Sequence, residues 1–307
     1  MPIGPNMRKM SSTEGWPEED SSLPHPDAAT ATIHPTAHHV RVMRLMIALA
    51  SSALAVQNAI VIPIADNALL IDRTPAEVLI HDDVCDCPYI EGQVARMPLR
   101  LPIRPLQPNE FDQRLARGDR RHGVALYTPT CPDCHACEPI RIDTASFRFS
   151  RTHRRILNQG NRLLRIETGP PLLSRSRVDL YEKHLHGRGL AKPEHPPMTL
   201  PRYRGFVVDR FCDTFELRLF LNDELVGVAI TDRGADALSA HYTYYDPDYP
   251  RLSLGTYAIL KQIELARERE MHHLYLGLFI AENESMRYKA RFHPHERLVR
   301  SIWTSFD

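Results

Sequence analysis

Three strand-like runs, followed by a helix and one more strand, limit the fold of this chain most strongly. Residues 215–221 and 225–231 are rich in Phe, Leu, Val and Ile, and Asn222 and Asp223 between them are typical of a tight turn. A third run covers 237–245. Apolar residues at helical spacing predict a helix over 255–270, and 273–280 reads as another strand. An antiparallel meander, a helix and a crossover strand together require a mixed sheet.

This order of elements is that at the centre of the acyl-CoA N-acyltransferase (GNAT) fold. We therefore predict an α+β protein with a GNAT-like mixed sheet and helices, preceded by a Cys/Arg-rich N-terminal section. The helix is entered through Arg251 and Gly255, where free backbone amides and the positive dipole end would face a phosphate or ester oxygen. The alternative is that Gly255 only eases the transition from strand to helix.

The first 70 residues differ in composition from the rest of the 307-residue chain. Residues 1 to about 40 are rich in Pro, Ser, Thr and His, which bury too little apolar surface to fold alone. The uncharged run 45–65 is interrupted by polar residues and Pro63, so a membrane span or cleaved signal is the weaker alternative. We predict a cytoplasmic protein without membrane association in three parts: a poorly ordered or mis-started extension over 1–70, a Cys/Arg-rich N-terminal domain over 71–170 and a GNAT-like domain over 171–307.

Five of the six cysteines fall between positions 85 and 137. Cys131, Cys134 and Cys137 form a C-x-x-C-x-x-C motif whose spacing directs several thiolates toward one point, and Cys87, or else Cys85, is the obvious fourth ligand. A four-thiolate site suits zinc and an iron–sulfur cluster equally well. A redox pair and a set of reduced structural thiols are the alternatives. The spacing does not resemble that of a secreted disulfide scaffold.

Positive charge is concentrated in one section of a chain that is neutral overall. The 38 basic residues balance the 38 acidic ones, so no global field draws the protein to nucleic acid. Between Arg96 and Arg177, however, sixteen Arg and no Lys face seven Asp and Glu, which leaves a net charge of +9. Since the guanidinium matches phosphate oxygens bidentately, this excess favours a phosphate-rich partner over a merely solvated surface.

Ordered sequence blocks through most of the chain resemble the arginyl/leucyl-tRNA–protein transferase family. Its N-terminal half is matched by Cys87–Ile90, Arg121–Gly123, Cys131–Arg141 and Phe149–Arg155. Its C-terminal half is matched by Tyr242–Pro247, Arg251–Tyr257, Leu274–Gly277 and Met286–Pro294. Two departures are Cys85, an additional thiol, and Leu278, which stands where the family usually has an aromatic residue.

The resemblance implies an enzyme that transfers Leu or Arg from charged tRNA to proteins that begin with Asp or Glu, marking them for the N-degron pathway of degradation. The length is similar to that of the compact bacterial, leucyl-transferring form. The implied partners are Leu-tRNA or Arg-tRNA and the acceptor proteins; no cofactor is required for transfer, and we expect a monomer. The alternatives are an acetyl-CoA-dependent GNAT acyltransferase and a zinc-ribbon nucleic-acid-binding protein.

Substrate-binding residues follow from the needs of the two substrates. We assign Arg151, Arg154 and Arg155, which lie within five positions, to tRNA phosphates. Arg251 and Gly255 would hold the acceptor end of the tRNA.

The side-chain carboxylate of the acceptor protein needs a cation in the cleft. Our candidates are Lys289 and Arg291, with Arg120 and Arg121 as less favoured ones.

Catalysis requires that the acceptor amine attack the ester of the charged tRNA. Asp246, at the end of the third strand, would take a proton from the amine or orient it, with Tyr242 beside it. Tyr288 would donate a hydrogen bond to the oxyanion. The alternatives are an Asp-Pro turn with core aromatic residues, and a Tyr that packs under the helix.

Overall fold

The structure, a computed structural model, describes residues 70–191 and 196–307. The extension predicted over residues 1–70 lies outside this part except for Leu70, and so does the uncharged run 45–65. In the described residues, no helix is long and apolar enough to cross a membrane.

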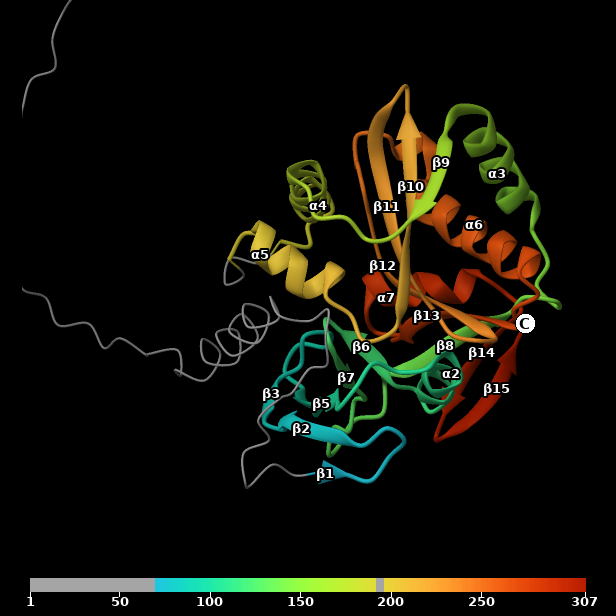
Figure 1. Ribbon diagram of the computed structural model, residues 1–307. Helices are drawn as coiled ribbons and strands as arrows, with labels where there is room; N and C mark the ends of the chain where they lie inside the picture. The colour runs from blue at the N-terminus through green and yellow to red at the C-terminus, as the bar shows by residue number, and fades with distance from the viewer. Residues whose placement is uncertain (1–69, 192–195) are drawn as a thin grey trace, which may run out of the picture. The chain divides into compact units, whose positions relative to one another are not determined.

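An eight-stranded mixed sheet forms the main scaffold (Figure 1). In order across the sheet, the strands are β15 (Ile302–Phe306), β14 (His295–Val299), β8 (Glu138–Asp143), β13 (His273–Phe279), β12 (Ala237–Tyr245), β11 (Glu224–Arg233), β10 (Asp213–Leu221) and β9 (Arg165–Gly169). The predicted meander is β10 to β12, all antiparallel, and its first turn places Asn222 and Asp223 at positive φ. The predicted helix is α6 (Leu254–Glu268), and β13 follows it parallel to β12. The mixed α+β fold with this GNAT-like order is therefore confirmed.

Strands β12 and β13 stay paired over only part of their length. Their parallel register runs from Ala237 opposite His273 to Ser239 opposite Tyr275 and stops there. The pairing of β13 with β8 shifts register between Tyr275 and Gly277, and Gly277 has φ +92°. Such an irregularity bends a strand away from its neighbour. The C-terminal halves of β12 and β13 therefore separate.

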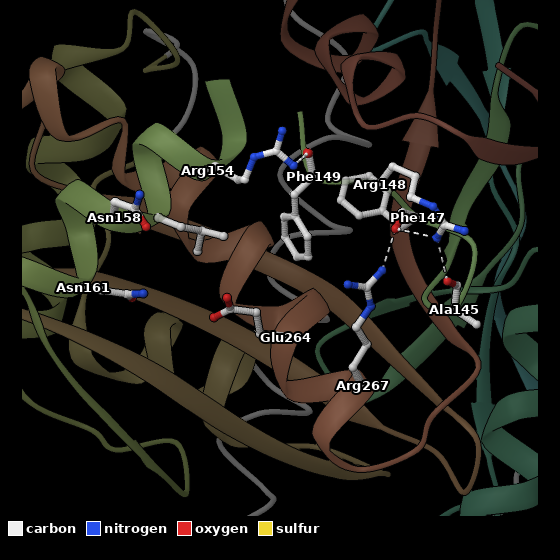
Figure 2. Close-up of a pocket in the computed structure, with 10 residues that line it drawn as sticks. Ala145, Phe147, Arg148, Phe149, Arg154, Asn158, Asn161, Glu264 and Arg267 are labelled. Atoms are coloured by element: carbon white, nitrogen blue, oxygen red, sulfur yellow. Dashed lines mark hydrogen bonds between the residues drawn. The ribbon is translucent and has the colours of Figure 1, made fainter. Parts of the chain in front are cut away.

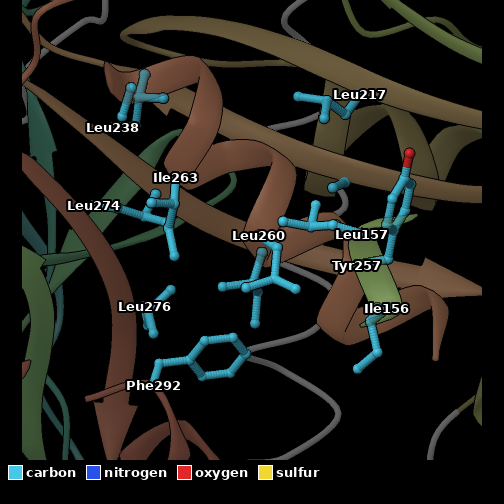
Figure 3. Packing of buried hydrophobic residues seen from close by; sticks show 14 of the residues in the cluster. Ile156, Leu157, Leu217, Leu238, Tyr257, Leu260, Ile263, Leu274, Leu276 and Phe292 are labelled. Carbon is cyan, nitrogen blue, oxygen red and sulfur yellow. The ribbon is translucent and has the colours of Figure 1, made fainter. Parts of the chain in front are cut away.

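Helices cover both faces of the sheet. On one face α6 packs against the strands, and α3 (Arg151–Leu163) packs on α6; Figure 3 shows Leu260 and Ile263 of α6 facing Leu274 and Leu276 of β13. On the other face, buried side chains of α4 (Arg175–Gly187), α5 (Leu200–Tyr203) and η2 (Arg204–Val208) pack against β11 and β12. The burial of these apolar faces is the main stabilising contribution to the fold.

A second, five-stranded sheet is built from the N-terminal residues. Its order is β1 (Leu70–Ile71), β2 (Glu77–His81), β5 (Leu99–Pro102), β7 (Ala125–Tyr127) and β6 (Arg120–His122). The hairpin β3 (Val84–Asp86) with β4 (Val94–Arg96) and helix α2 (Pro108–Ala116) belong to the same section. A buried ion pair of 2.9 Å between Arg121 of β6 and Asp232 of β11 joins this sheet to the large one.

The predicted domain boundary at residue 170 does not separate the two sheets. β8, α3 and β9 all precede that boundary, yet β8 pairs with β13 and β9 pairs with β10. The section before residue 138 supplies the small sheet, and the section after it supplies the large one.

Candidate functional site

Helix α3 presents a basic surface without a carboxylate of its own. Its sequence RTHRRILNQGNRL holds four Arg and no Asp or Glu, and Ser150 caps its start by accepting the amide of His153 at 3.1 Å. Because His153, Ile156 and Leu157 are buried, the arginines of the helix lie on the opposite, exposed side. A hollow of about 590 Å³ is lined by polar residues of this helix alone: Arg151, Arg154, Arg155, Asn158, Gln159 and Arg162.

A second hollow, of about 550 Å³, lies between α3 and α6. Figure 2 shows Arg148, Arg154 and Arg267 around it. Their guanidinium groups donate to backbone carbonyls: Arg154 to Phe149 at 2.6 Å, for example, and Arg267 to Thr144 at 2.6 Å. Glu264 is the only carboxylate in its lining, so the two hollows form one predominantly positive surface.

Ion pairing with Asp or Glu divides the sixteen arginines between Arg96 and Arg177 into two groups. Nine of the sixteen form ion pairs with Asp or Glu: Arg96, Arg100, Arg104, Arg114, Arg121, Arg141, Arg165, Arg175 and Arg177. The other seven have no carboxylate within 4.0 Å in the described residues: Arg117, Arg120, Arg148, Arg151, Arg154, Arg155 and Arg162. Five of these seven lie on or just before α3. The unneutralised charge is therefore concentrated there.

The start of helix α6 lies beside this surface, because η3 (Pro250–Leu252) contacts α3. Arg251 of η3 is exposed, and Ser253 enters the helix with φ 50° and ψ 45°. Among the described residues, the amides of Leu254, Gly255 and Thr256 have no hydrogen-bond acceptor outside the helix. Free amides at a helix start attract an anionic or ester oxygen.

Gly255 also permits close packing. A Cβ at this position would lie 2.8 Å from Cε1 of Tyr245, so only glycine allows the ring to approach the helix. Gly255 can therefore serve the local packing at the transition from strand to helix and still present its amide to a bound oxygen.

Aromatic side chains surround the start of α6. The ring of Tyr245 contacts that of His184 from α4, with centroids 4.6 Å apart. The amide of Tyr245 donates to Nδ1 of His184 at 3.2 Å, and burial lowers the pKa of His184 to about 4. Burial and the neighbouring Tyr245 raise the pKa of Tyr288 to about 12, although 37% of this side chain is exposed. Tyr288 is therefore protonated at neutral pH and able to donate a hydrogen bond.

Asp246 is already engaged by neighbours. Its Oδ2 accepts Nζ of Lys183 at 2.6 Å, and its Oδ1 accepts the amide of Asp248 at 2.9 Å. A carboxylate held in this way shapes the turn after β12 and is less available as a base. Tyr242 packs against Tyr181 of α4, with ring centroids 5.5 Å apart, and burial raises its pKa.

The two predicted cations for the acceptor carboxylate have different environments. Lys289, in η4 (Tyr288–Arg291), is only 8% exposed, whereas Arg291 at the end of the same element is exposed. Nζ of Lys289 donates to the carbonyl of Leu278 at 2.6 Å. The short helix α7 (Glu284–Arg287) precedes η4 and contacts β13.

The predicted cysteine ligands share one neighbourhood but do not converge on a metal position. Burial, and then the proximity of the thiols of Cys131, Cys87 and Cys134, raise the pKa of Cys137 to about 12. Within residues 70–191 and 196–307, no group of three or more His, Cys, Asp or Glu is placed where it could hold a metal ion. The cysteines as placed do not fit a bound metal, and the zinc or iron–sulfur assignment stays a prediction.

Sequence reasoning missed Lys183 and His184, which pair with the end of β12. Both lie on α4, about sixty positions before their partners, and neither forms a motif with them. The sequence indicated only the helical pattern of the α4 segment, which predicts a helix but not the strand that it packs against.

Comparisons with known proteins agree with the resemblance seen in the ordered sequence blocks. Residues 85–155 match the N terminus of the arginine-tRNA-protein transferase family, and residues 176–299 match its C terminus. The aspartate/glutamate leucyltransferase of Halorhodospira halophila is 38% identical over 224 residues, which cover 71% of this chain and 92% of that protein. The aspartate/glutamate leucyltransferase of Alkalilimnicola ehrlichii is 40% identical over 220 residues, covering 71% and 91%.

Solved structures are more distantly similar. FemX aligns with a TM-score of 0.41 and 8% identity, covering 73% of this chain and 84% of that one. L-PGS from Bacillus licheniformis aligns with a TM-score of 0.38 and 13% identity, covering 55% and 58%. The sequence matches, which span both halves of the described core, are decisive: this chain belongs to the arginine-tRNA-protein transferase family.

Proposed function

We propose that this protein transfers leucine from Leu-tRNA to the α-amino group of proteins that begin with Asp or Glu, and so marks them for degradation in the cytoplasm. The relatives named aspartate/glutamate leucyltransferase support Leu as the donor amino acid. The observation that carries the proposal is the surface of α3, where four Arg have no carboxylate partner in the described residues. Neither an acetyl-CoA-dependent acyltransferase nor a zinc-ribbon protein explains that surface together with the family match.

The donor tRNA binds along α3 in this proposal. Arg151, Arg154 and Arg155 contact its phosphates, and the exposed Arg251 continues this surface to the start of α6. The free amides at Gly255 and its neighbours then hold the ester-bearing end. This arrangement brings the ester to the end of β12, beside Tyr245 and Tyr288.

Positioning supplies much of the rate enhancement. The ester of charged tRNA is already activated, and an α-amino group with a pKa near 8 is partly neutral without help. Bringing two such reactants together lowers a barrier by roughly 7–11 kcal/mol. Tyr288 donates to the developing oxyanion, while Asp246, held by Lys183, and Tyr242 shape the wall at the end of β12.

Transfer from two donors to four acceptors tests the proposal. The purified full-length protein is incubated with Leu-tRNA or Arg-tRNA and with peptides that begin with Asp, Glu, Lys or Ala. We expect leucine on the Asp and Glu peptides only. Transfer from Arg-tRNA alone would change the donor, and transfer to Lys would overturn the acceptor class. No transfer to Asp or Glu from either donor would refute the function.

A further inference from the structure

Arg120 is unusual among the buried arginines of residues 70–191 and 196–307. Arg100, Arg114, Arg121 and Arg177 are also buried, and each lies 2.5–2.9 Å from a carboxylate oxygen of Glu77, Asp119, Asp232 or Glu216. Arg120 is 9% exposed, yet no Asp or Glu lies within 4.0 Å of it in the described part of the chain. Burying a guanidinium without a counter-ion is costly, so such a group is retained where it serves a ligand.

Lys289, like Arg120, is a buried cation without a carboxylate partner in the described residues. It is 8% exposed, and its Nζ contacts the carbonyl of Leu278 at 2.6 Å and Sδ of Met286 at 3.0 Å, with no carboxylate among its described neighbours. Burial first, and the positive charge of Arg120 second, lower the pKa of Lys289 to about 7. The two cations therefore lie close enough to repel each other, which an anion between them would relieve.

Arg120 and Lys289 both contact the same backbone segment of β13, at Gly277 and Leu278 respectively. An ideal Cβ at Gly277 would lie 2.8 Å from Nη2 and 3.2 Å from Cζ of Arg120. Only glycine lets the guanidinium lie against the backbone here, and φ +92° also favours glycine. The next carbonyl along the strand, that of Leu278, receives Lys289. This backbone segment lies where β13 has separated from β12.

We propose that Arg120 and Lys289, above the Gly277–Leu278 backbone, form the subsite that binds the side-chain carboxylate of the acceptor protein's N-terminal Asp or Glu. This inference rests on the proposed transfer reaction. Both side chains are less than a tenth exposed, so the subsite admits one small anionic group and not a run of phosphates. Nζ of Lys289 lies 6.0 Å from the ring centroid of Tyr288, the proposed oxyanion donor, so an acceptor residue bound there would lie next to the reacting ester.

The subsite also explains how acceptors are distinguished. An N-terminal Asn or Ala would enter without a negative charge and leave both buried cations unpaired. A site built to pair a polar group rejects an analogue without that group far more strongly than an apolar pocket rejects a size difference. Arg121 and Arg291 are not part of the subsite, since the former is paired with Asp232 and the latter is exposed.

Transfer kinetics of R120Q and K289M on peptides that begin with Asp or Asn test this assignment. We expect kcat/KM on the Asp peptide to fall at least about 100-fold and the Asp-over-Asn preference to approach unity, while affinity for Leu-tRNA is unchanged. R117Q removes an exposed, unpaired charge three residues from Arg120 and serves as the matched control. A full Asp-over-Asn preference in R120Q and K289M would overturn the subsite.

A measurement on the wild-type protein covers the case in which a variant does not fold. An Asp peptide, and not an Asn peptide, should protect Lys289 from reductive methylation in the absence of tRNA, as read by mass spectrometry. Equal methylation with both peptides would refute the subsite. If the wild-type protein transfers leucine to the Asp peptide but the peptide does not protect Lys289, the subsite is refuted and the proposed function stands. If the peptide protects Lys289 but no leucine is transferred, the proposed function is refuted and the subsite stands.

Discussion

We predict that the double variant R151Q/R155Q binds Leu-tRNA more weakly than the wild type, because both arginines belong to the proposed tRNA surface of α3. Both arginines are exposed on α3 and have no carboxylate partner in the described residues, so their replacement should leave the fold intact. Each phosphate contact contributes about 0.7–0.9 to the slope of log K against log salt. Two lost contacts should therefore lower the slope by about 1.4–1.8. At about 0.15 M salt, that corresponds to a roughly 15- to 30-fold weaker affinity, or ~1.6–2 kcal/mol.

Filter binding of Leu-tRNA over about 0.05–0.3 M KCl measures both quantities. The control is R117Q/R210Q, which removes two exposed arginines away from α3 and should keep the wild-type slope. An unchanged slope in R151Q/R155Q, or an equal loss in the control, would show that α3 does not contact the phosphates.

Four further predictions concern packing, chemistry, pH and metal content. Gly160→Ala should cost about 1–3 kcal/mol in urea unfolding, because its Cβ would lie within 3 Å of the Tyr257 ring; an unchanged midpoint would contradict this packing. Tyr288→Phe should lower kcat roughly 100-fold with little change in KM, and a change in KM alone would argue against oxyanion donation. The lowered pKa of Lys289 means that the unfolded chain binds more protons than the native one between pH about 7 and 10.5. Wild-type stability relative to K289M should therefore rise with pH in that window, and a flat difference would refute the buried, unpaired lysine. Metal analysis of the purified protein tests the predicted cysteine site. Stoichiometric zinc or iron that is lost when Cys131 and Cys134 are replaced by Ser would support the site, and metal-free active protein would refute it.

The sequence predicts local elements well where periodicity and turn chemistry agree. The meander of β10 to β12 follows from apolar runs separated by Asn222 and Asp223, which accept positive φ. Helix α6 follows from its 3.6-residue spacing and ends within two residues of the predicted boundary at 270. Strand β8, by contrast, is separated from its partner β13 by more than 120 positions, and no local pattern specifies that pairing.

Charge and burial are harder to predict because they depend on partners distant in sequence. Arg120 and Arg121 are neighbours of the same type, yet Arg121 is neutralised by Asp232 and Arg120 is not. The net positive charge between Arg96 and Arg177 therefore predicts that the protein has a basic surface for a phosphate-rich partner, but it does not show where that surface lies. Lys289 and Arg291 were equal candidates by sequence, and only the packing of η4 against β13 distinguishes the buried one.

Mass spectrometry of a peptide that begins with Asp, after incubation with the protein and Leu-tRNA, shows whether leucine has been transferred. We predict a mass increase of one leucyl residue, with fragment ions that place it on the α-amino group, and no increase for the matched peptide that begins with Asn. An unmodified Asp peptide would contradict the proposed transfer, and leucine on both peptides would contradict the proposed acceptor specificity.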